Sequence, residues 1–341
     1  MSQNQAAWID GKGQLFQVRS APMPKPGPGQ LVIKNQAVAV NPADWKNQKN
    51  ASFIKRWPFI LGIDVAGTVE EVGKGVTRFT KGQRVISHVQ GLRDQDPAQG
   101  AFQLYPLVEE VFTSGIPDSI SIERGAVLPL AISTATSGLY LPKYLDLPYL
   151  PSPNPKPTGK TILIWGGASS VGAVTIQFAV ASGLKVITTA SPANHEFVKV
   201  MGASVVFDYR SPSVVDDIVK ELQGSELAGV YDAIAEEPSF EPISEILKRL
   251  NRQVKVAAVL PCPKPSEGFD PIFIFGYEIA TTPNEKLGEA IWAKFVPQAL
   301  ASGQLQPKPD PVVVGHGLEE IQHGLEVQKA GVSAKKVVVT L

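Results

Sequence analysis

The stretch Ile162-Leu-Ile-Trp-Gly-Gly-Ala-Ser-Ser-Val-Gly172 decides the fold of this chain. Its first residues are apolar and predict a buried strand that ends at Trp165, followed by a turn of small residues and a helical pattern. Such a turn exposes backbone N–H groups at the N-terminus of a helix, where the helix dipole favours a pyrophosphate. Gly167 and Gly172 match the pattern G-x-G-x-x-G, with Ser169 replacing the middle glycine, so the surrounding elements decide whether the motif is meaningful.

The residues around this turn alternate between strands and helices. Strands are expected at 161–165, 185–190, 204–208, 230–234 and 254–259, and helices at 171–182, 193–201, 213–222 and 242–250. Nearly continuous apolar strands that alternate with helices are typical of a parallel sheet covered on both faces. The middle of the chain is therefore predicted to be a Rossmann-type, doubly wound domain that binds a dinucleotide, with Gly172 allowing close helix–strand packing.

The end of the second strand indicates which dinucleotide is bound. An acidic residue there would bind the ribose 2′-hydroxyl of NAD, but the segment 188–194 reads TTASPAN and holds no carboxylate. Ser191 and Asn194 are short hydrogen-bonding side chains, and Lys199 follows one to two helical turns later. These residues would accept a 2′-phosphate, so NADPH is predicted over NADH. Serine and asparagine are also ordinary helix caps, which leaves that second role open.

The first third of the chain is expected to be rich in β-structure. Strands are predicted at 31–40, 65–72 and 83–87, with glycine-rich turns between them, as in a small barrel or sandwich. The prolines between Pro148 and Pro157 predict a stiff connector before the first strand of the parallel sheet, and lining of a substrate entrance is the alternative. From Leu287 on we expect a helix and a closing strand, 335–341, that rejoins the first domain.

Composition excludes several classes of function. The chain has 341 residues, 32 basic and 32 acidic side chains, and no basic stripe of the kind that binds a nucleic-acid backbone. The single cysteine, Cys262, cannot form an internal disulfide. Neither a signal peptide nor a run of about 18 apolar residues appears. We therefore expect a soluble cytoplasmic protein, monomeric or homodimeric, without nucleic-acid or membrane partners.

Several motifs, in serial order, resemble the medium-chain dehydrogenase/reductase family over essentially the whole chain. They are NPADWK at 41–46, PFILGIDVAGTV at 58–69, GQRV at 82–85, GAFQ at 100–103, LPLAISTA at 128–135 and the glycine turn. The chain is most similar to the zinc-independent branch, which includes quinone reductases and fungal enoyl reductases that act in trans with polyketide synthases. Features typical of that branch are SSVG at 169–172, SPAN at 191–194, VFDYR at 206–210 and SAKK at 333–336.

The resemblance implies a GroES-like, β-rich catalytic domain at 1–124 and 281–341, a Rossmann domain at 125–280, and an active site in the cleft between them. It implies cofactor contacts at Ala43, Asp44, Trp45, Lys46, Ser169, Ser170, Val171, Gly172, Ser191, Pro192, Ala193, Asn194, Tyr209, Ser333, Ala334 and Lys335, to which the glycine motif adds Gly167 and the residues after the second strand add Lys199. It also implies that Lys46, Ser133 and Thr134 are catalytic, and that Ile132, Ser133, Phe275 and Tyr277 contact the substrate. The segment 273–277 has the alternative role of a core strand.

No metal is predicted. Where the zinc-dependent branch has Gly-His-Glu, this chain has Gly62-Ile63-Asp64, and one cysteine cannot form a structural zinc knot. The four histidines are widely separated, and we expect each of them to be a surface or capping residue; they are His88, His195, His316 and His323.

Without a metal, a conjugated C=C bond is a more accessible hydride acceptor than an isolated carbonyl. Hydride would add at the β-carbon, and negative charge would spread onto the carbonyl oxygen, so donors must point at that oxygen. Lys46, Ser133 and Thr134 are the predicted donors, although a lysine after a turn is often simply solvated. Tyr140 is a further donor candidate unless it packs in the core, and bulk water is an alternative proton source.

Three functions remain open from the sequence. The first is an NADPH-dependent enoyl reductase of polyketide biosynthesis, which acts in trans on an enoyl thioester carried by a synthase. The second is a stand-alone reductase of small quinones or alkenals. The third is a redox-inactive protein that binds NADPH.

Overall fold

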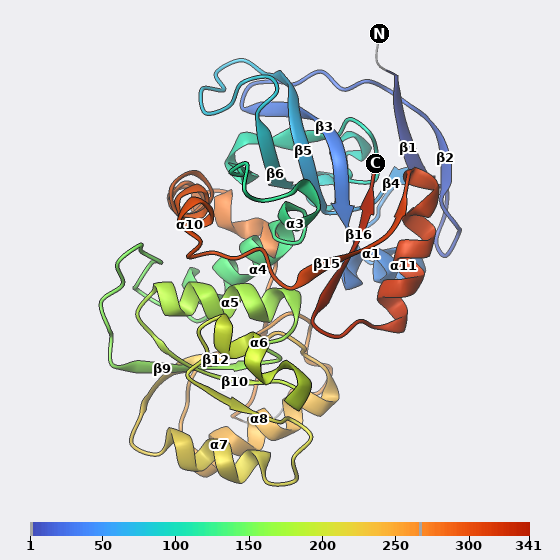
Figure 1. Ribbon diagram of the computed structural model, residues 1–341. Coiled ribbons are helices and arrows are strands. Elements are labelled where there is room, and N and C mark those ends of the chain that lie inside the picture. Colours follow the sequence, from blue (N-terminus) through green and yellow to red (C-terminus); the bar gives the residue numbers. More distant parts are fainter. Residues whose placement is uncertain (1–2, 266–267) are drawn as a thin grey trace. The chain divides into compact units, whose positions relative to one another are not determined.

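The computed structural model describes residues 3–265 and 268–341, which fall into two compact units (Figure 1). The first unit comprises Met1–Leu130, Gly288–Ala301 and Pro307–Leu341, and the second comprises Ala131–Leu287 and Ser302–Gln306. The expected domain boundaries, after residues 124 and 280, lie slightly before the places where these units divide.

The second unit is built on a six-stranded parallel sheet. Its strands are β9 (Lys160–Trp165), β10 (Lys185–Thr189), β11 (Val205–Phe207), β12 (Glu226–Asp232), β13 (Val256–Ala258) and β14 (Ile272–Phe273). The order across the sheet is β11-β10-β9-β12-β13-β14, and every neighbouring pair is parallel. This is the doubly wound order of a Rossmann fold, in which the strand order reverses beside the first strand. The predicted fold class is confirmed.

Helices accompany this sheet along the chain. They are α4 (Pro129–Tyr140), which begins in the first unit, α5 (Ser170–Ala181), α6 (His195–Val200), α7 (Val214–Leu222), α8 (Glu237–Leu250) and α9 (Glu285–Gly288), with short turns η3 (Pro192–Asn194) and η4 (Gly276–Ala280). The predicted start of α8 at Pro242 is wrong, because a capping box formed by Glu236 and Ser239 begins the helix earlier and Pro242 lies inside it.

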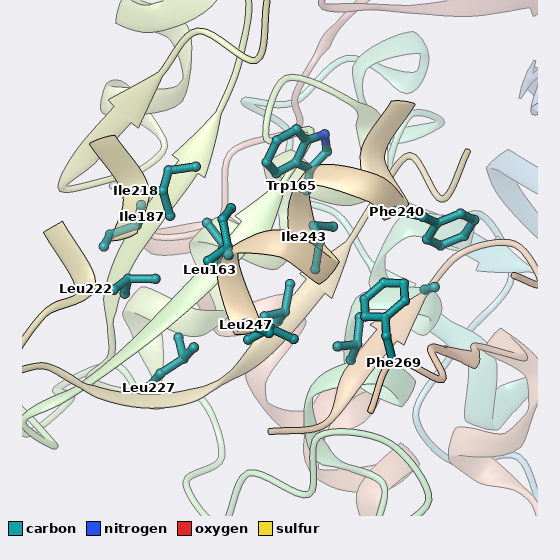
Figure 2. Packing of buried hydrophobic residues seen from close by; sticks show 14 of the residues in the cluster. Leu163, Trp165, Ile187, Ile218, Leu222, Leu227, Phe240, Ile243, Leu247 and Phe269 are labelled. Atoms are coloured by element: carbon teal, nitrogen blue, oxygen red, sulfur yellow. The ribbon is translucent and has the colours of Figure 1, made fainter. Parts of the chain in front are cut away.

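The apolar face of α8 packs on the sheet and on α7 (Figure 2). Leu163 and Ile187 from the strands meet Ile218, Ile243 and Leu247 from the helices, all of them buried. Full burial of one such side chain contributes about 1.5–3 kcal/mol. This core holds the carboxyl ends of the strands in fixed positions, which is what a binding edge requires.

Proline-rich residues 148–157 lie within the second unit, where they join α4 to β9. The backbone N–H of Ser152 donates to the carbonyl of Ala181 at 2.8 Å, and that of Thr158 donates to Gly183 at 2.9 Å. The segment is therefore a connector tied to the end of α5.

The first unit contains most of the β-structure. A three-stranded sheet has the order β2 (Gln17–Ala21), β1 (Asn4–Ile9), β4 (Phe59–Ile60). A larger sheet has the order β15 (Asp310–His316), β16 (Lys335–Thr340), β3 (Gln30–Ala39), β5 (Asp64–Val72), β6 (Arg84–His88), β8 (Thr113–Gly115), with β7 (Leu107–Glu109) on β3. Strand β16 pairs antiparallel with β3, which confirms that the closing strand rejoins the N-terminal domain.

Short helices complete the first unit. They are α1 (Pro42–Asn50), α2 (Gly91–Asp94), η1 (Pro97–Gln99), η2 (Glu110–Phe112), α3 (Ile122–Gly125), η5 (Glu289–Phe295), α10 (Val296–Ser302), η6 (Leu318–Glu320) and α11 (Ile321–Ala330). Within residues 3–265 and 268–341, none of the helices has the length and apolar character needed to cross a bilayer.

Candidate functional site

The glycine turn after β9 is fixed by hydrogen bonds from the neighbouring strand. Gly166 has a φ of +79°, which favours glycine, and its N–H donates to Thr189 Oγ1 at 3.0 Å. The N–H of Gly167 donates to the carbonyl of Thr189, also at 3.0 Å. The end of β10 therefore shapes the turn that the sequence assigns to a pyrophosphate.

Helix α5 begins directly after this turn and packs closely on it. The N–H of Gly172 donates to the Ser169 hydroxyl at 3.0 Å, so Ser169 is the N-cap of α5. A Cβ atom on Gly172 would lie 2.3 Å from the carbonyl oxygen of Gly166. Gly172 thus permits the helix N-terminus to approach the turn, while Ser170 and Val171 form the first residues of α5.

The residues after β10 form a small polar group without a carboxylate. Asn194 Nδ2 donates to Ser191 Oγ at 3.0 Å, and neither residue caps α6 with its side chain. Pro192 and Ala193 are exposed between them. Lys199 is exposed and pairs with Glu196 at 2.8 Å. The polar groups at the end of this strand are therefore a hydroxyl, an amide and the His195 ring, whose Nε2 lies 3.1 Å from the carbonyl of Ala190.

Tyr209 follows β11 at the same edge of the sheet and is 41% exposed. The Arg210 guanidinium lies over its ring, 5.1 Å from the centroid. Arg210 is not among the site residues predicted from the sequence. The available signal was its place beside Tyr209 after a strand that neighbours β10, where a second cation favours a phosphate.

The predicted catalytic and substrate residues of the second unit lie close together. Ile132, Ser133 and Thr134 are buried on α4. A Cβ on Gly276 would lie 2.9 Å from Thr134 Oγ1, so the segment between Phe275 and Tyr277 packs against α4. The Phe275 and Tyr277 rings lie 5.0 Å apart. This segment is a 3₁₀ turn after β14, and the alternative of a strand holds only up to Phe273.

Tyr140 packs in the core of the second unit. Its hydroxyl lies 2.8 Å from Ser182 Oγ, and burial raises the pKa of Tyr140 above its usual value. A buried, hydrogen-bonded phenol of this kind serves packing, so the alternative that the sequence offered for Tyr140 is the one the structure favours.

Helix α1 carries the remaining segment expected to contact the cofactor. Lys46 lies on this helix and is half-buried, with its ammonium 5.5 Å from the centroid of the Trp45 ring. Asp44 is fully buried, and its carboxylate accepts the N–H of Asn41 at 2.8 Å. The Asp44 side chain therefore caps α1 and does not point to solvent, while Ala43, Trp45 and Lys46 are partly exposed.

A buried polar cluster lies at the start of α1. Lys336 Nζ donates to Asn41 Oδ1 and lies 3.2 Å from Asp64 Oδ2, and Asn41 Nδ2 donates to the same Asp64 oxygen at 2.8 Å. The backbone N–H of Leu130 donates to Asp64 Oδ1 at 2.6 Å. Burial raises the pKa of the nearby Asp44 carboxyl to about 7, and the Asp64 charge adds to the rise.

Residues 333–335 lead into this cluster from the C-terminal part of the first unit. Ser333 and Lys335 are exposed, and Ala334 has a φ of +46°. Lys336, the next residue, is 5% exposed and begins the buried part of β16. Lys336 belongs to the motif SAKK at 333–336 but is not among the site residues predicted from the sequence.

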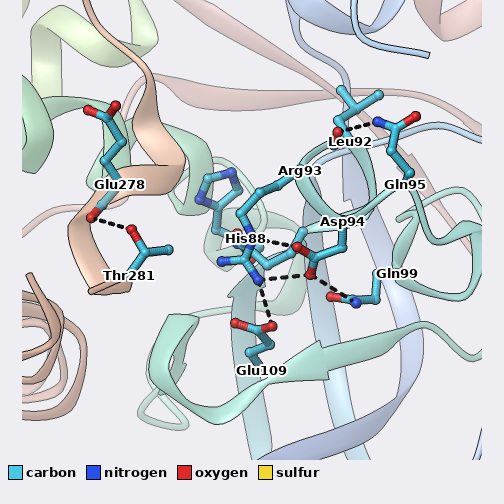
Figure 3. A network of polar contacts seen from close by, with 10 residues as sticks. His88, Leu92, Arg93, Asp94, Gln95, Gln99, Glu109, Glu278 and Thr281 are labelled. Atoms are coloured by element: carbon cyan, nitrogen blue, oxygen red, sulfur yellow. Dashed lines mark hydrogen bonds and ion pairs between the residues drawn. The ribbon is translucent and has the colours of Figure 1, made fainter. Parts of the chain in front are cut away.

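The prediction that all histidines lie at the surface or cap helices is wrong for His88. Its ring is fully buried and packs edge-on against Phe112 at 5.7 Å. Arg93 lies nearby, bonded to Asp94 at 2.6 Å and to Glu109 at 2.7 Å (Figure 3). Burial lowers the pKa of His88 to about 3, and the positive charge of Arg93 contributes. The other histidines are exposed or half-buried.

The residues of the segment Gly62–Asp64 do not fit a zinc ion. Ile63 occupies the position of a ligand histidine, and the neighbouring Asp64 carboxylate is already bonded to a lysine, an asparagine and a backbone N–H. No group of three or more histidine, cysteine or acidic side chains within the described residues could hold a metal ion.

Comparisons with known proteins cover both units. Residues 27–118 match the model of the alcohol dehydrogenase GroES-like domain, and residues 170–279 match that of the zinc-binding dehydrogenase. The chain is 44% identical to the trans-enoyl reductase himH of Aspergillus japonicus, over 99% of this chain and 97% of that one. It is 42% identical to the dehydrogenase pigH of Monascus ruber over the full length of both.

The fold is similar to that of an alcohol dehydrogenase superfamily protein from Novosphingobium aromaticivorans. The TM-score is 0.79 with 25% sequence identity, and the match covers 99% of each chain.

Proposed function

The chain belongs to the medium-chain dehydrogenase/reductase family, and from this premise we propose that it is an NADPH-dependent enoyl reductase. Its substrate is an α,β-unsaturated thioester carried by a separate polyketide synthase. The observation that supports this most is the match to a trans-enoyl reductase over nearly the whole of both chains. The bound cofactor supplies a hydride for the β-carbon of the substrate.

The carboxyl edge of the parallel sheet fits a dinucleotide phosphate. The turn at Gly166 and Gly167 and the N-terminus of α5 offer backbone N–H groups and a positive dipole end. Ser191 and Asn194 offer neutral groups after β10, where an NAD-specific protein would hold a carboxylate, and Arg210 follows the neighbouring strand β11. This donor set supports a 2′-phosphate and hence NADPH.

The proposed chemistry needs no metal. Lys46 donates a proton or a hydrogen bond from α1, and Ser133 and Thr134 orient the substrate from α4. Asp64, which lies in the segment where the family resemblance implies zinc ligands, pairs with Lys336.

Replacement of Lys46 by alanine tests its role. We expect kcat to fall by roughly 100-fold, because one positioned acid contributes about 10²–10⁴ to such a step. The fold should be retained, since Lys46 is only half-buried on the surface of α1. Steady-state kinetics of the purified variant, with its circular dichroism spectrum, decide the matter. Wild-type kcat and KM in this variant would remove Lys46 from the mechanism.

Replacement of Ser191 by aspartate tests the cofactor choice. The added carboxylate would repel a 2′-phosphate and bind a ribose hydroxyl instead, so the preference should move toward NADH by at least about tenfold. Ser204→Asp is the matched control, because Ser204 is exposed at the opposite, amino end of β11. Dissociation constants for both cofactors measure the change. An equal shift in both variants would contradict a specific role for Ser191.

The decisive experiment for the proposed function is a screen of cofactor oxidation, followed by the nicotinamide absorbance. NADPH and NADH are each offered with enoyl thioesters, with quinones and with small enones. We expect turnover with NADPH and enoyl thioesters. Turnover with quinones alone would instead favour a stand-alone reductase, and tight NADPH binding without turnover would favour a redox-inactive protein.

A further inference from the structure

We propose that Lys336 is a positioning residue for the cofactor-binding segments of the first unit, an inference that rests on the proposed function through its cofactor. It acts through Asn41, the residue that begins α1, and so fixes where Ala43–Lys46 lie. Nothing in the motif pattern assigns this role to Lys336, which follows the exposed segment Ser333–Lys335.

The side-chain amide of Asn41 is held at both of its ends. Its side-chain oxygen accepts from Lys336 Nζ, and its side-chain nitrogen donates to Asp64 Oδ2 at 2.8 Å. Both ends of the amide are therefore held, by strands β16 and β5. The backbone of the same region is also paired, since the N–H of Val40 donates to the carbonyl of Val337 at 2.9 Å. The N-terminus of α1 cannot turn without breaking these contacts.

The cluster around Asn41 contains buried charged side chains. Asp44 and Asp64 are both fully buried, and Lys336 is the buried cation that pairs with Asp64, at 3.2 Å. Removal of one partner from a buried ion pair leaves an uncompensated charge, which the surrounding structure accommodates by moving or by admitting water. We expect the first turn of α1 and the turn before β16 to be the elements that move, because they adjoin Asn41 and Lys336.

Movement of these two elements would displace the residues that are proposed to contact the cofactor. Ala43–Lys46 follow Asn41 directly, and Ser333–Lys335 precede Lys336 directly. One lysine thus anchors both of the segments of the first unit that are proposed to contact the cofactor. Displacement of such groups by about 1 Å can cost on the order of 100-fold in function, so a positioning role predicts a measurable loss of affinity.

The test compares Lys336→Gln with Lys336→Arg in the full-length protein. NADPH affinity is measured by calorimetry, and the order of α1 by amide hydrogen exchange over residues 42–50 without cofactor. We expect Lys336→Gln to raise Kd by at least about tenfold and to speed exchange in the first turn of α1. Lys336→Arg, which keeps the charge but has a bulkier, planar head group, should lose less affinity than Lys336→Gln. Lys329→Gln, an exposed change in the last turn of α11, is the control.

Asn41→Ser supplies a second variant if Lys336→Gln fails to fold. Serine is a good N-cap but is too short to reach both Lys336 and Asp64. A raised Kd in Asn41→Ser supports the link between the residues, whereas wild-type affinity means that capping alone matters and overturns the proposal. The proposal is equally overturned if Lys336→Gln lowers thermal stability while Kd and exchange stay unchanged.

These measurements distinguish a failure of the Lys336 proposal from a failure of the proposed function. If wild-type protein binds NADPH but reduces no enoyl thioester, the proposed function fails while a tenfold ratio of Kd still supports the role of Lys336. If wild-type protein binds no nicotinamide cofactor, both proposals are overturned.

Discussion

Gly172→Ala should abolish measurable binding of a nicotinamide cofactor and lower the free energy of unfolding by about 1–3 kcal/mol, the usual range for overpacking. The added Cβ would lie 2.3 Å from the carbonyl oxygen of Gly166 and 2.9 Å from Gly167 Cα. Both contacts are with backbone atoms, so no side-chain rotation can relieve them. The turn and the start of α5 must separate, and the N–H groups proposed to hold the pyrophosphate would no longer converge.

Gly115→Ala is the matched control for this substitution. Gly115 also has a backbone that alanine can adopt, and its added Cβ would meet only the flexible end of Gln83, at 3.1 Å. We expect a change of less than about 0.5 kcal/mol and unchanged binding. Calorimetric titration with NADPH and urea unfolding of both variants make the comparison. Wild-type affinity in Gly172→Ala would show that the cofactor does not use this turn.

The parallel sheet was predictable from the sequence because its signal is local. Each strand is a short apolar run with helical residues on both sides, and the glycine turn after Trp165 marks where the order begins. The return of β16 to β3 was expected only through the family resemblance and a closing apolar run. The pairing of two strands that lie so far apart in the sequence leaves no signal in the local pattern of apolar residues.

Local patterns failed where a tertiary contact decides the outcome. The start of α8 was missed because a proline favours the first turn of a helix, yet Pro242 lies inside α8 and Pro238 near its start. The burial of His88 on β6 was missed because an isolated histidine carries no pattern. The cluster of Lys336, Asn41 and Asp64 joins residues far apart in sequence, and the pairing of β3 with both β16 and β5 brings them together.

The buried Asp44 and His88 should contribute nearly equal and opposite pH dependences to the free energy of unfolding between about pH 4 and pH 6.5. The pKa of Asp44 is about 7 in the folded state against 3.8 as a model value, so its contribution is full at low pH and is lost as pH rises through about 7. The pKa of His88 is about 3 against 6.5, so its contribution is full above pH 6.5 and is lost as pH falls.

Single substitutions should separate the two effects. Asp44→Asn removes the aspartate contribution, so its stability relative to wild type should fall by roughly 3 kcal/mol as pH is lowered from 6.5 to 3.8. His88→Gln removes the histidine contribution, so its stability relative to wild type should rise by a similar amount over the same range. His323→Gln, an exposed change on α11, should follow the wild-type curve.

Urea unfolding at several pH values between those limits measures the slopes. Burial also raises the pKa values of Glu109 and Asp232, but these groups are unchanged in every variant and cancel in the comparison. If the stability of Asp44→Asn and of His88→Gln, each relative to wild type, changed with pH in the same direction, the opposite contributions assigned to these two groups would be contradicted. Opposite slopes would mean that the Asp44 carboxyl is protonated below about pH 7. Asp44 would then accept the N–H of Asn41 as an uncharged acid, and Lys336 would neutralise Asp64 alone.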